Sequence, residues 1–177
     1  MRLLITGGSS YFGQHLVPSA TPNFEVCYTY HQNDPLALPI GQQLDIRDET
    51  AVSHLITSFQ PDTVIHLAGS NRGSAMAEVI VQGTKNVTQA AAQTNTRLIH
   101  MSTDCVFDGL QPPYDETAIP PPINAYGQAK AEAEAIVQAH ENHVIIRTSL
   151  IYSLENMDHG TSWMAAALRE GKPVTLF

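Results

Sequence analysis

Apolar residues along the chain follow two alternating patterns. Short, nearly continuous apolar runs are typical of strands buried on both faces of a sheet. Longer segments in which apolar residues recur at helical spacing are typical of helices that cover such a sheet. The predicted strands are 3–5, 24–30, 44–46, 63–69, 97–102 and 144–148. The predicted helices are 9–17, ending near Pro18, then 49–59, 75–94, 124–139 and 162–170. This alternation predicts an α/β fold built on a doubly wound parallel sheet.

A glycine turn separates the first predicted strand from the first predicted helix. Gly7, Ser10 and Gly13 have the spacing of the dinucleotide-binding fingerprint, with serine where the middle glycine usually stands. In that fold the pyrophosphate lies on backbone amides at the start of the helix, here at Tyr11 and Phe12. Ser10 adds a small side chain and a hydroxyl donor. The turn therefore predicts a Rossmann-like, NAD(P)-binding domain, although one imperfect glycine motif is not specific.

Residues after the second and third predicted strands bear on the choice between NADP and NAD. An acidic residue at the end of the second strand binds the adenosine ribose hydroxyls of NAD, whereas a basic residue tolerates the extra phosphate of NADP. His31 follows this strand and favours NADP, unless it is simply a loop histidine in water; Asp34 nearby leaves NAD possible. Asp45 and Ile46 lie in the short third run, where Asp45 either accepts a hydrogen bond from an adenine amine or caps the next helix.

Small residues end the strand predicted at 63–69. Leu67, Ala68 and Gly69 lie where the carboxyl end of a parallel strand meets a ligand. They leave room for a cofactor, and they would also pack well without one.

A tyrosine and a lysine stand four residues apart at the start of the helix predicted at 124–139. Tyr126 and Lys130 therefore lie one turn apart on one helical face, and Asn124 can cap that helix. An ammonium group close to a phenol favours the phenolate and lowers the phenol pKa from its usual value of about 10. The pair can act as a tuned proton donor or acceptor, and the alternative is a solvated helix that carries both residues.

Composition limits the classes of function. A chain of 177 residues is long enough for one well-buried domain, and its net charge of -8 argues against general nucleic-acid binding. Cys27 and Cys105 have no metal-like spacing, so no metal site is predicted. We interpret both as reduced, structural thiols, which suits the cytoplasm. The first apolar run is too short for a signal peptide, and no run is long enough for a membrane span.

The order of these motifs along the chain carries a resemblance. The glycine turn comes first, then the strand end 66–69, the run 102–104, and the pair formed by Tyr126 and Lys130. In this order they resemble the extended short-chain dehydrogenase/reductase family. The segments 102–109, 113–116 and 124–127 are similar, more narrowly, to the family of dTDP-4-dehydrorhamnose reductase and its relatives.

The resemblance implies the reduction of a keto group on a nucleotide-linked sugar, with NADP as cofactor and NAD possible. It implies that Tyr126 donates a proton to the developing alkoxide. It implies that Lys130 binds the nicotinamide ribose hydroxyls and lowers the Tyr126 pKa. Thr103 would hydrogen-bond the substrate oxygen or the Tyr126 hydroxyl, and Asp104 would orient substrate or ribose. A homodimer is possible.

The chain departs from that family at three positions and in length. Ser10 replaces a glycine, Ile80 stands where relatives often have an asparagine that orders the sheet near the active site, and Cys105 replaces an aromatic residue. Relatives continue beyond this length and build most of the substrate pocket there. We therefore expect residues 1–177 to form an NAD(P)-binding Rossmann domain with the beginning of a substrate lobe from about 151, and an incomplete substrate site.

Two other functions fit the same motifs. One is a nucleotide-sugar epimerase or dehydratase that uses bound NAD without net turnover. The other is a non-catalytic NAD(P)-binding regulatory subunit, which Ser10, Ile80 and the short length favour and the Tyr126–Lys130 pair disfavours.

Overall fold

The computed structural model describes residues 1–119, 121–153 and 157–175, without the side chains of 159 and 160. Within them, six strands form one sheet in the order β3-β2-β1-β4-β5-β6, and every neighbouring pair is parallel. The strands are β1 (Arg2–Thr6), β2 (Glu25–Tyr30), β3 (Gly41–Gln43), β4 (Thr63–His66), β5 (Arg97–Thr103) and β6 (His143–Thr148). The helices are α1 (Tyr11–Ala20), α2 (Glu49–Phe59), α3 (Met76–Gln93), α4 (Ala125–Gln138) and α5 (His159–Arg169), with a short 3-10 turn, η1 (Asp104–Val106). The predicted doubly wound parallel α/β fold is confirmed.

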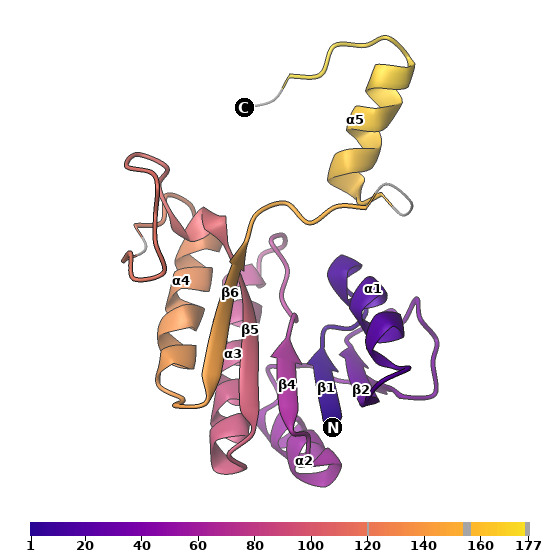
Figure 1. The fold of residues 1–177 in the computed structure, drawn as a ribbon, viewed down its shortest axis with the longest axis vertical. Coiled ribbons are helices and arrows are strands. Elements are labelled where there is room, and N and C mark those ends of the chain that lie inside the picture. The colour runs from indigo at the N-terminus through magenta and orange to yellow at the C-terminus, as the bar shows by residue number, and fades with distance from the viewer. Residues whose placement is uncertain (120, 154–156, 176–177) are drawn as a thin grey trace.

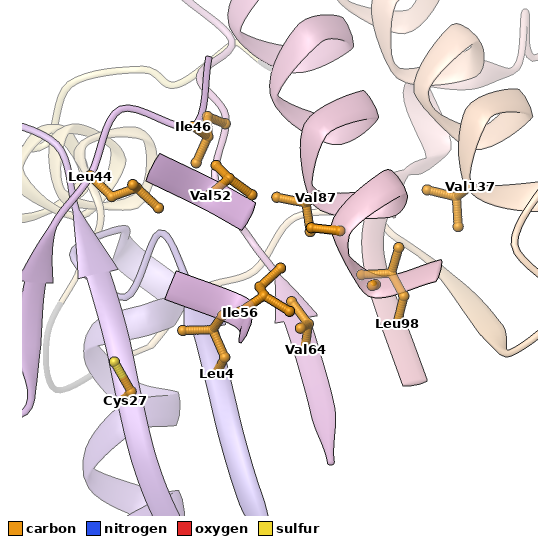
Figure 2. Close-up of a cluster of buried hydrophobic side chains, with 12 residues drawn as sticks. Leu4, Cys27, Leu44, Ile46, Val52, Ile56, Val64, Val87, Leu98 and Val137 are labelled. Atoms are coloured by element: carbon orange, nitrogen blue, oxygen red, sulfur yellow. The ribbon is translucent and has the colours of Figure 1, made fainter. Parts of the chain in front are cut away.

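Two apolar clusters hold helices against opposite faces of this sheet. On one face, residues of β1, β2, β4 and β5 pack against α2, α3 and α4; Figure 2 shows Leu4, Val64 and Leu98 meeting Ile56 and Val87 there. On the other face, alternate residues of β1 and β2 pack against α1. Successive side chains of a strand point to opposite faces, so the continuous apolar runs of the sequence supply both clusters.

Helix α5 lies apart from the sheet and its covering helices (Figure 1). The segment that leads to α5 leaves the carboxyl end of β6, the edge strand of the sheet. Trp163 and Leu168 of α5 are exposed. Among the described residues, no helix is both long and apolar enough to cross a membrane.

Four predicted elements differ from the structure. The strand predicted at 63–69 ends at His66, and the last helix begins at His159 instead of 162. The third strand is Gly41–Gln43 instead of 44–46, because Leu44 and Ile46 are buried in the core cluster beside α2 while the polar edge strand pairs with β2. The first helix continues through Pro18 to Ala20. Proline removes one hydrogen bond inside a helix, at about 3 kcal/mol. Val17 and Ala20 are both buried against β1 and β2, and this packing favours the additional turn.

The strand order places a crevice above the carboxyl ends of β1 and β4. Chain connections leave β1 toward β2 on one side, and the chain returns to β4 on the other side. In open α/β sheets, ligands bind at such a topological switch point.

Candidate active site

Two adjoining clefts open at the carboxyl edge of the sheet. The larger cleft has a volume of about 690 Å³, and the smaller cleft has a volume of about 290 Å³. Ser10, Ala68, Gly69 and Ser70 line both, so the two clefts are neighbours. The larger cleft is also lined by the predicted residues Tyr11, Phe12, Leu67, Thr103, Asp104, Tyr126 and Lys130. The smaller cleft is also lined by the predicted residues Gly7, His31, Asp45 and Ile46.

Gly13 is the one predicted site residue that lines neither cleft. A Cβ atom on Gly13 would lie 2.6 Å from backbone atoms of Gly7 and Gly8, so this glycine lets α1 pack closely on the turn. Gly7 itself has φ +74, and a Cβ there would lie 2.7 Å from the backbone of Ala68. These glycines thus bring the start of α1 to the crevice, where the amides of a first helical turn have no partner within the helix.

Ser10 caps α1. Its hydroxyl oxygen accepts a hydrogen bond from the Gly13 amide at 3.1 Å, and its backbone has φ -66, which any residue adopts. The position therefore does not require glycine. The hydroxyl oxygen accepts the helix-cap hydrogen bond, and the hydroxyl proton as a donor to a ligand stays a prediction.

Asp45, at the smaller cleft, forms a two-pronged ion pair with Arg47. The Arg47 Nε and Nη2 atoms donate to Asp45 at 3.0 and 2.6 Å, and His31 Nε2 lies 3.6 Å from the same carboxylate. The hydrogen bonds from Arg47 lower the Asp45 pKa to about 2. The alternative of Asp45 as a helix cap is wrong, because Asp48 caps α2 through the Ala51 amide.

Arg47 is a residue of the smaller cleft that the sequence interpretation missed. It directly follows Ile46, so its place after the short apolar run was the available signal. Asp34, which left NAD possible, does not line this cleft: it accepts hydrogen bonds from the Tyr28 hydroxyl at 2.9 and 2.7 Å. The basic groups at the cleft are therefore His31 and Arg47, with Asp45 between them.

Thr103 and Asp104 lie where β5 passes into η1. The Thr103 hydroxyl donates to Asp104 Oδ1 at 3.2 Å and accepts from the Cys105 amide at 3.2 Å. The predicted bond between Thr103 and Tyr126 is not among the hydrogen bonds of these residues. Cys105 is exposed and lines the larger cleft, so its interpretation as a structural thiol is wrong. Cys27 is buried, as expected, and burial raises its pKa to about 11.

Helix α4 brings Tyr126 to the larger cleft. Asn124 caps the helix by accepting a hydrogen bond from the Gly127 amide at 2.7 Å, as predicted. A Cβ atom on Gly127 would lie 2.2 Å from the Cys105 carbonyl oxygen, so only glycine allows this close approach of α4 to η1. Burial, followed by the negative charges of Cys105 and Asp104, raises the Tyr126 pKa.

The predicted lowering of the Tyr126 pKa is therefore wrong for this arrangement, and the position of Lys130 explains why. The Lys130 ammonium donates to the carbonyl oxygen of Met101 at 2.6 Å and lies 3.2 Å from His100 Nε2. Burial lowers the Lys130 pKa to about 8, and Glu134 opposes that shift. Lys130 therefore remains mostly charged at neutral pH, and Tyr126 remains a neutral phenol.

Glu134 anchors α4 to the ends of β5 and β6. Only 2% of this carboxylate side chain is exposed. It accepts hydrogen bonds from the Ser102 hydroxyl at 2.5 Å and from Arg147 Nη2 at 2.8 Å. The Arg147 guanidinium also lies 4.9 Å above the ring of Phe107, in the loop that leads away from the site. The carboxylate thus fixes the elements that carry Thr103 and Lys130.

Ile80 forms an apolar part of the larger cleft instead of a polar support for the sheet. It is fully buried and packs with Ala129 and Ala133 of α4. The sequence interpretation also missed Thr148, Ser149, Leu150 and Ile151, which line the larger cleft at the end of β6 and directly after it. Their place after a parallel strand was the signal that could have identified them.

Among the residues that the structure describes, no group of three histidine, cysteine, aspartate or glutamate side chains is arranged to hold a metal ion. The donors that meet at the clefts are hydroxyl, amide, ammonium and guanidinium groups, which suit an anionic or polyhydroxylated ligand.

Comparisons with known proteins agree with this geometry. A family model described as RmlD substrate binding domain matches residues 1–177. A dTDP-4-dehydrorhamnose reductase from Sinorhizobium fredii is 37% identical over 155 residues, covering 86% of this chain and 51% of the relative. The methionine adenosyltransferase 2 subunit beta from Bos taurus is 31% identical over 167 residues, covering 85% of this chain and 47% of the relative.

A solved structure shares the fold as well. The dTDP-4-dehydrorhamnose reductase from Bacillus anthracis, in complex with NADP, superposes with a TM-score of 0.78 and 25% identity, covering 95% of this chain and 60% of that chain. The present chain thus spans about half the length of the curated relatives that it matches.

Proposed function

The chain belongs to the RmlD substrate binding domain family, and from this we propose that it forms the cofactor-binding part of an NADP(H)-dependent reductase of nucleotide-linked keto sugars. One observation carries the proposal: Thr103, Asp104, Tyr126 and Lys130 line one cleft that adjoins a second cleft with two basic side chains. A dinucleotide has a reactive end and an adenosine end, and the two clefts could hold one end each.

The residues present fit such a cofactor. The start of α1 lies beside the point where the clefts meet, and the amino end of a helix suits a pyrophosphate. The ammonium of Lys130 in the larger cleft suits ribose hydroxyls. The nicotinamide cofactor, when bound, supplies the hydride for the carbonyl carbon of the substrate.

Tyr126 supplies the proton that completes the reduction. As hydride reaches the carbonyl carbon, negative charge develops on the carbonyl oxygen, and a placed donor stabilises that charge. The raised pKa of Tyr126 keeps its hydroxyl protonated at neutral pH, as a general acid requires. The ketone therefore gains one hydride and one proton, and the product is the corresponding alcohol with the oxidised cofactor. Thr103 and Asp104 would orient the reacting oxygen.

The smaller cleft favours NADP over NAD. His31 and Arg47 both border it, and a phosphate on the adenosine ribose would find two basic partners there. Asp45 already pairs with Arg47 and opposes the phosphate, so the preference depends on the balance of these charges.

Substrate, assembly and location are part of the same proposal. The segment from about 151, which leaves the edge of the sheet toward α5, would begin a substrate lobe, and the substrate site of residues 1–177 would be incomplete. A nucleotide sugar is the proposed substrate, a homodimer is the proposed assembly, and the cytoplasm suits the free thiols Cys27 and Cys105.

An assay with dTDP-4-dehydrorhamnose and NADPH tests the proposed reaction. We expect slow turnover in which each alcohol formed consumes one NADPH. The Tyr126→Phe variant should lose at least about 100-fold in rate and keep its NADPH binding. Tyr114→Phe is the matched control, because Tyr114 stacks on Phe107 and lines neither cleft. An unchanged rate in Tyr126→Phe would refute the role of the phenol, product formed without consumption of NADPH would indicate an epimerase, and rapid turnover would refute the incomplete substrate site.

A second candidate function is a non-catalytic NADP(H)-binding subunit. The relative named methionine adenosyltransferase 2 subunit beta, at 31% identity, favours it. This function predicts that NADPH binds and that neither the unaltered chain nor Tyr126→Phe reduces a keto sugar.

A further inference from the structure

A row of buried polar side chains crosses the sheet directly below the larger cleft. Thr6 of β1 stands opposite His66 of β4, and His66 stands opposite His100 of β5. Each of the three side chains is about 1% exposed. The row lies in the sheet interior, where apolar residues are the rule, so each polar group needs a partner.

His66 has partners on both ring nitrogens. Its Nδ1 lies 2.6 Å from the Thr6 hydroxyl, and its Nε2 lies 3.1 Å from the Thr84 hydroxyl of α3. Burial, followed by the charge of Lys130, lowers the His66 pKa to about 3, so the ring is neutral. Its ring centroid lies 5.3 Å from that of His100, and the rings are tilted by 34°. Both ring nitrogens of His66 therefore have hydrogen-bond partners, which hold the ring in place against His100.

His100 has a partner on one nitrogen only. Its Nε2 lies 3.2 Å from the Lys130 ammonium, and its Nδ1 is buried without a hydrogen-bond partner among the described residues. An ammonium has no lone pair, so Nε2 must accept and Nδ1 must carry the ring proton. A buried N–H without an acceptor destabilises the fold, and an apolar side chain would avoid it. The benefit of the imidazole therefore lies in its contact with Lys130.

The Lys130 ammonium has two hydrogen-bond acceptors on β5. One N–H points to the Met101 carbonyl oxygen at 2.6 Å, and a second points to His100 Nε2. The ammonium group has three N–H bonds in tetrahedral geometry. Because two of them are engaged, the direction of the third is also fixed. Lys130 lines the larger cleft beside Tyr126, and Glu134 is the further charged group that acts on it.

We propose that His100 is a positioning residue for Lys130: its Nε2 accepts one N–H of the buried ammonium, so that the third N–H is aimed into the larger cleft. If the proposed function holds, that third N–H meets the ribose hydroxyls of the cofactor. The inference about His100 and Lys130 concerns the chain alone, whereas its consequence for ribose binding rests on the proposed function.

A titration of the lysine side chains by NMR tests the proposal without any ligand. The chain contains three lysines, Lys85, Lys130 and Lys172, so the signals of a lysine-labelled chain can be assigned by substitution. We expect His100→Phe to lower the Lys130 pKa by about one unit, a tenfold loss of proton affinity, because the charged form loses an acceptor. We expect His100→Gln, whose side-chain oxygen can accept, to restore most of that loss. An unchanged Lys130 pKa in His100→Phe would overturn the proposal.

A second measurement uses the unaltered chain, so it stands even where a variant fails to fold. Nitrogen NMR of the labelled histidine ring should show His100 as a neutral imidazole with its proton on Nδ1 and with Nε2 as acceptor. A proton on Nε2 would overturn the proposal.

NADPH binding separates this inference from the proposed function. A Lys130 pKa that responds to His100 in a chain that does not bind NADPH would support the positioning role and refute the cofactor. NADPH binding, together with a Lys130 pKa that is unchanged by substitution of His100, would support the cofactor and refute the positioning role.

Discussion

Replacement of Lys130 by methionine should change how the stability of the chain depends on pH. Burial lowers the Lys130 pKa in the folded chain from 10.5 to about 8. Between these two values the unfolded chain binds more protons than the folded chain, so stability rises with pH. Lys130 therefore destabilises the fold below pH 8, and this effect fades as the pH rises toward 10.5. Lys130→Met removes the titrating group and should remove this dependence.

The magnitude follows from the shift of the Lys130 pKa. The full difference between the two values corresponds to about 3 kcal/mol. Only 8% of Lys130 is exposed, so little of this is screened by solvent. From about pH 7 to about pH 9.5, the native chain should gain about 2 kcal/mol of stability relative to Lys130→Met. The contacts that the variant loses, to Met101 and His100, enter the difference at both pH values.

Urea unfolding of both chains at the two pH values measures this difference. Tyrosine and cysteine titrations occur in both chains and largely cancel. Lys85→Met serves as the control, because Lys85 is exposed on α3 and its loss should leave the pH dependence unchanged. If the native chain and Lys130→Met keep the same stability difference from neutral to alkaline pH, burial does not lower the Lys130 pKa as described.

Three further substitutions test the packing around the site, each by urea unfolding. Gly127→Ala should destabilise the chain by about 1–3 kcal/mol, since the added methyl would lie 2.2 Å from the Cys105 carbonyl oxygen; a stabilised variant would contradict the close packing. Glu134→Gln should cost about 3 kcal/mol, because Arg147 loses its buried partner, and a neutral effect would contradict the anchoring role. Asp48→Ala should cost about 1 kcal/mol through loss of the α2 cap, and no loss would refute the cap.

The fold could be predicted from the sequence because the spacing of apolar residues matches the pattern of buried residues along most of the chain. The apolar runs at 3–5 and 24–30 supply side chains to both faces of the sheet, and that requirement is visible in the runs themselves. The third strand could not be placed, since it is short, polar and defined by its pairing with β2. Leu44 and Ile46 are apolar for a different reason, their burial beside α2.

The site could be predicted as a set of residues but not as a set of interactions. Parallel strands end at one edge, so residues after β1, β4 and β5 meet there, and this could be read from the sequence. The partners of Lys130 could not, because His100 looks like an ordinary strand residue until β5 and α4 are packed together. Arg47 was missed for the same reason: its approach to Asp45 and His31 depends on how the segment after β3 folds.

The central claim is that the two adjoining clefts bind a phosphorylated dinucleotide, and a fluorescence titration of the chain with NADPH and NADH tests it most directly. We expect saturable binding of NADPH, tighter than that of NADH by about tenfold, or about 1.4 kcal/mol. Arg47→Ala should reduce that difference, while Arg97→Ala, at the opposite end of β5, should preserve it. If neither NADPH nor NADH binds, the two clefts are not a dinucleotide site.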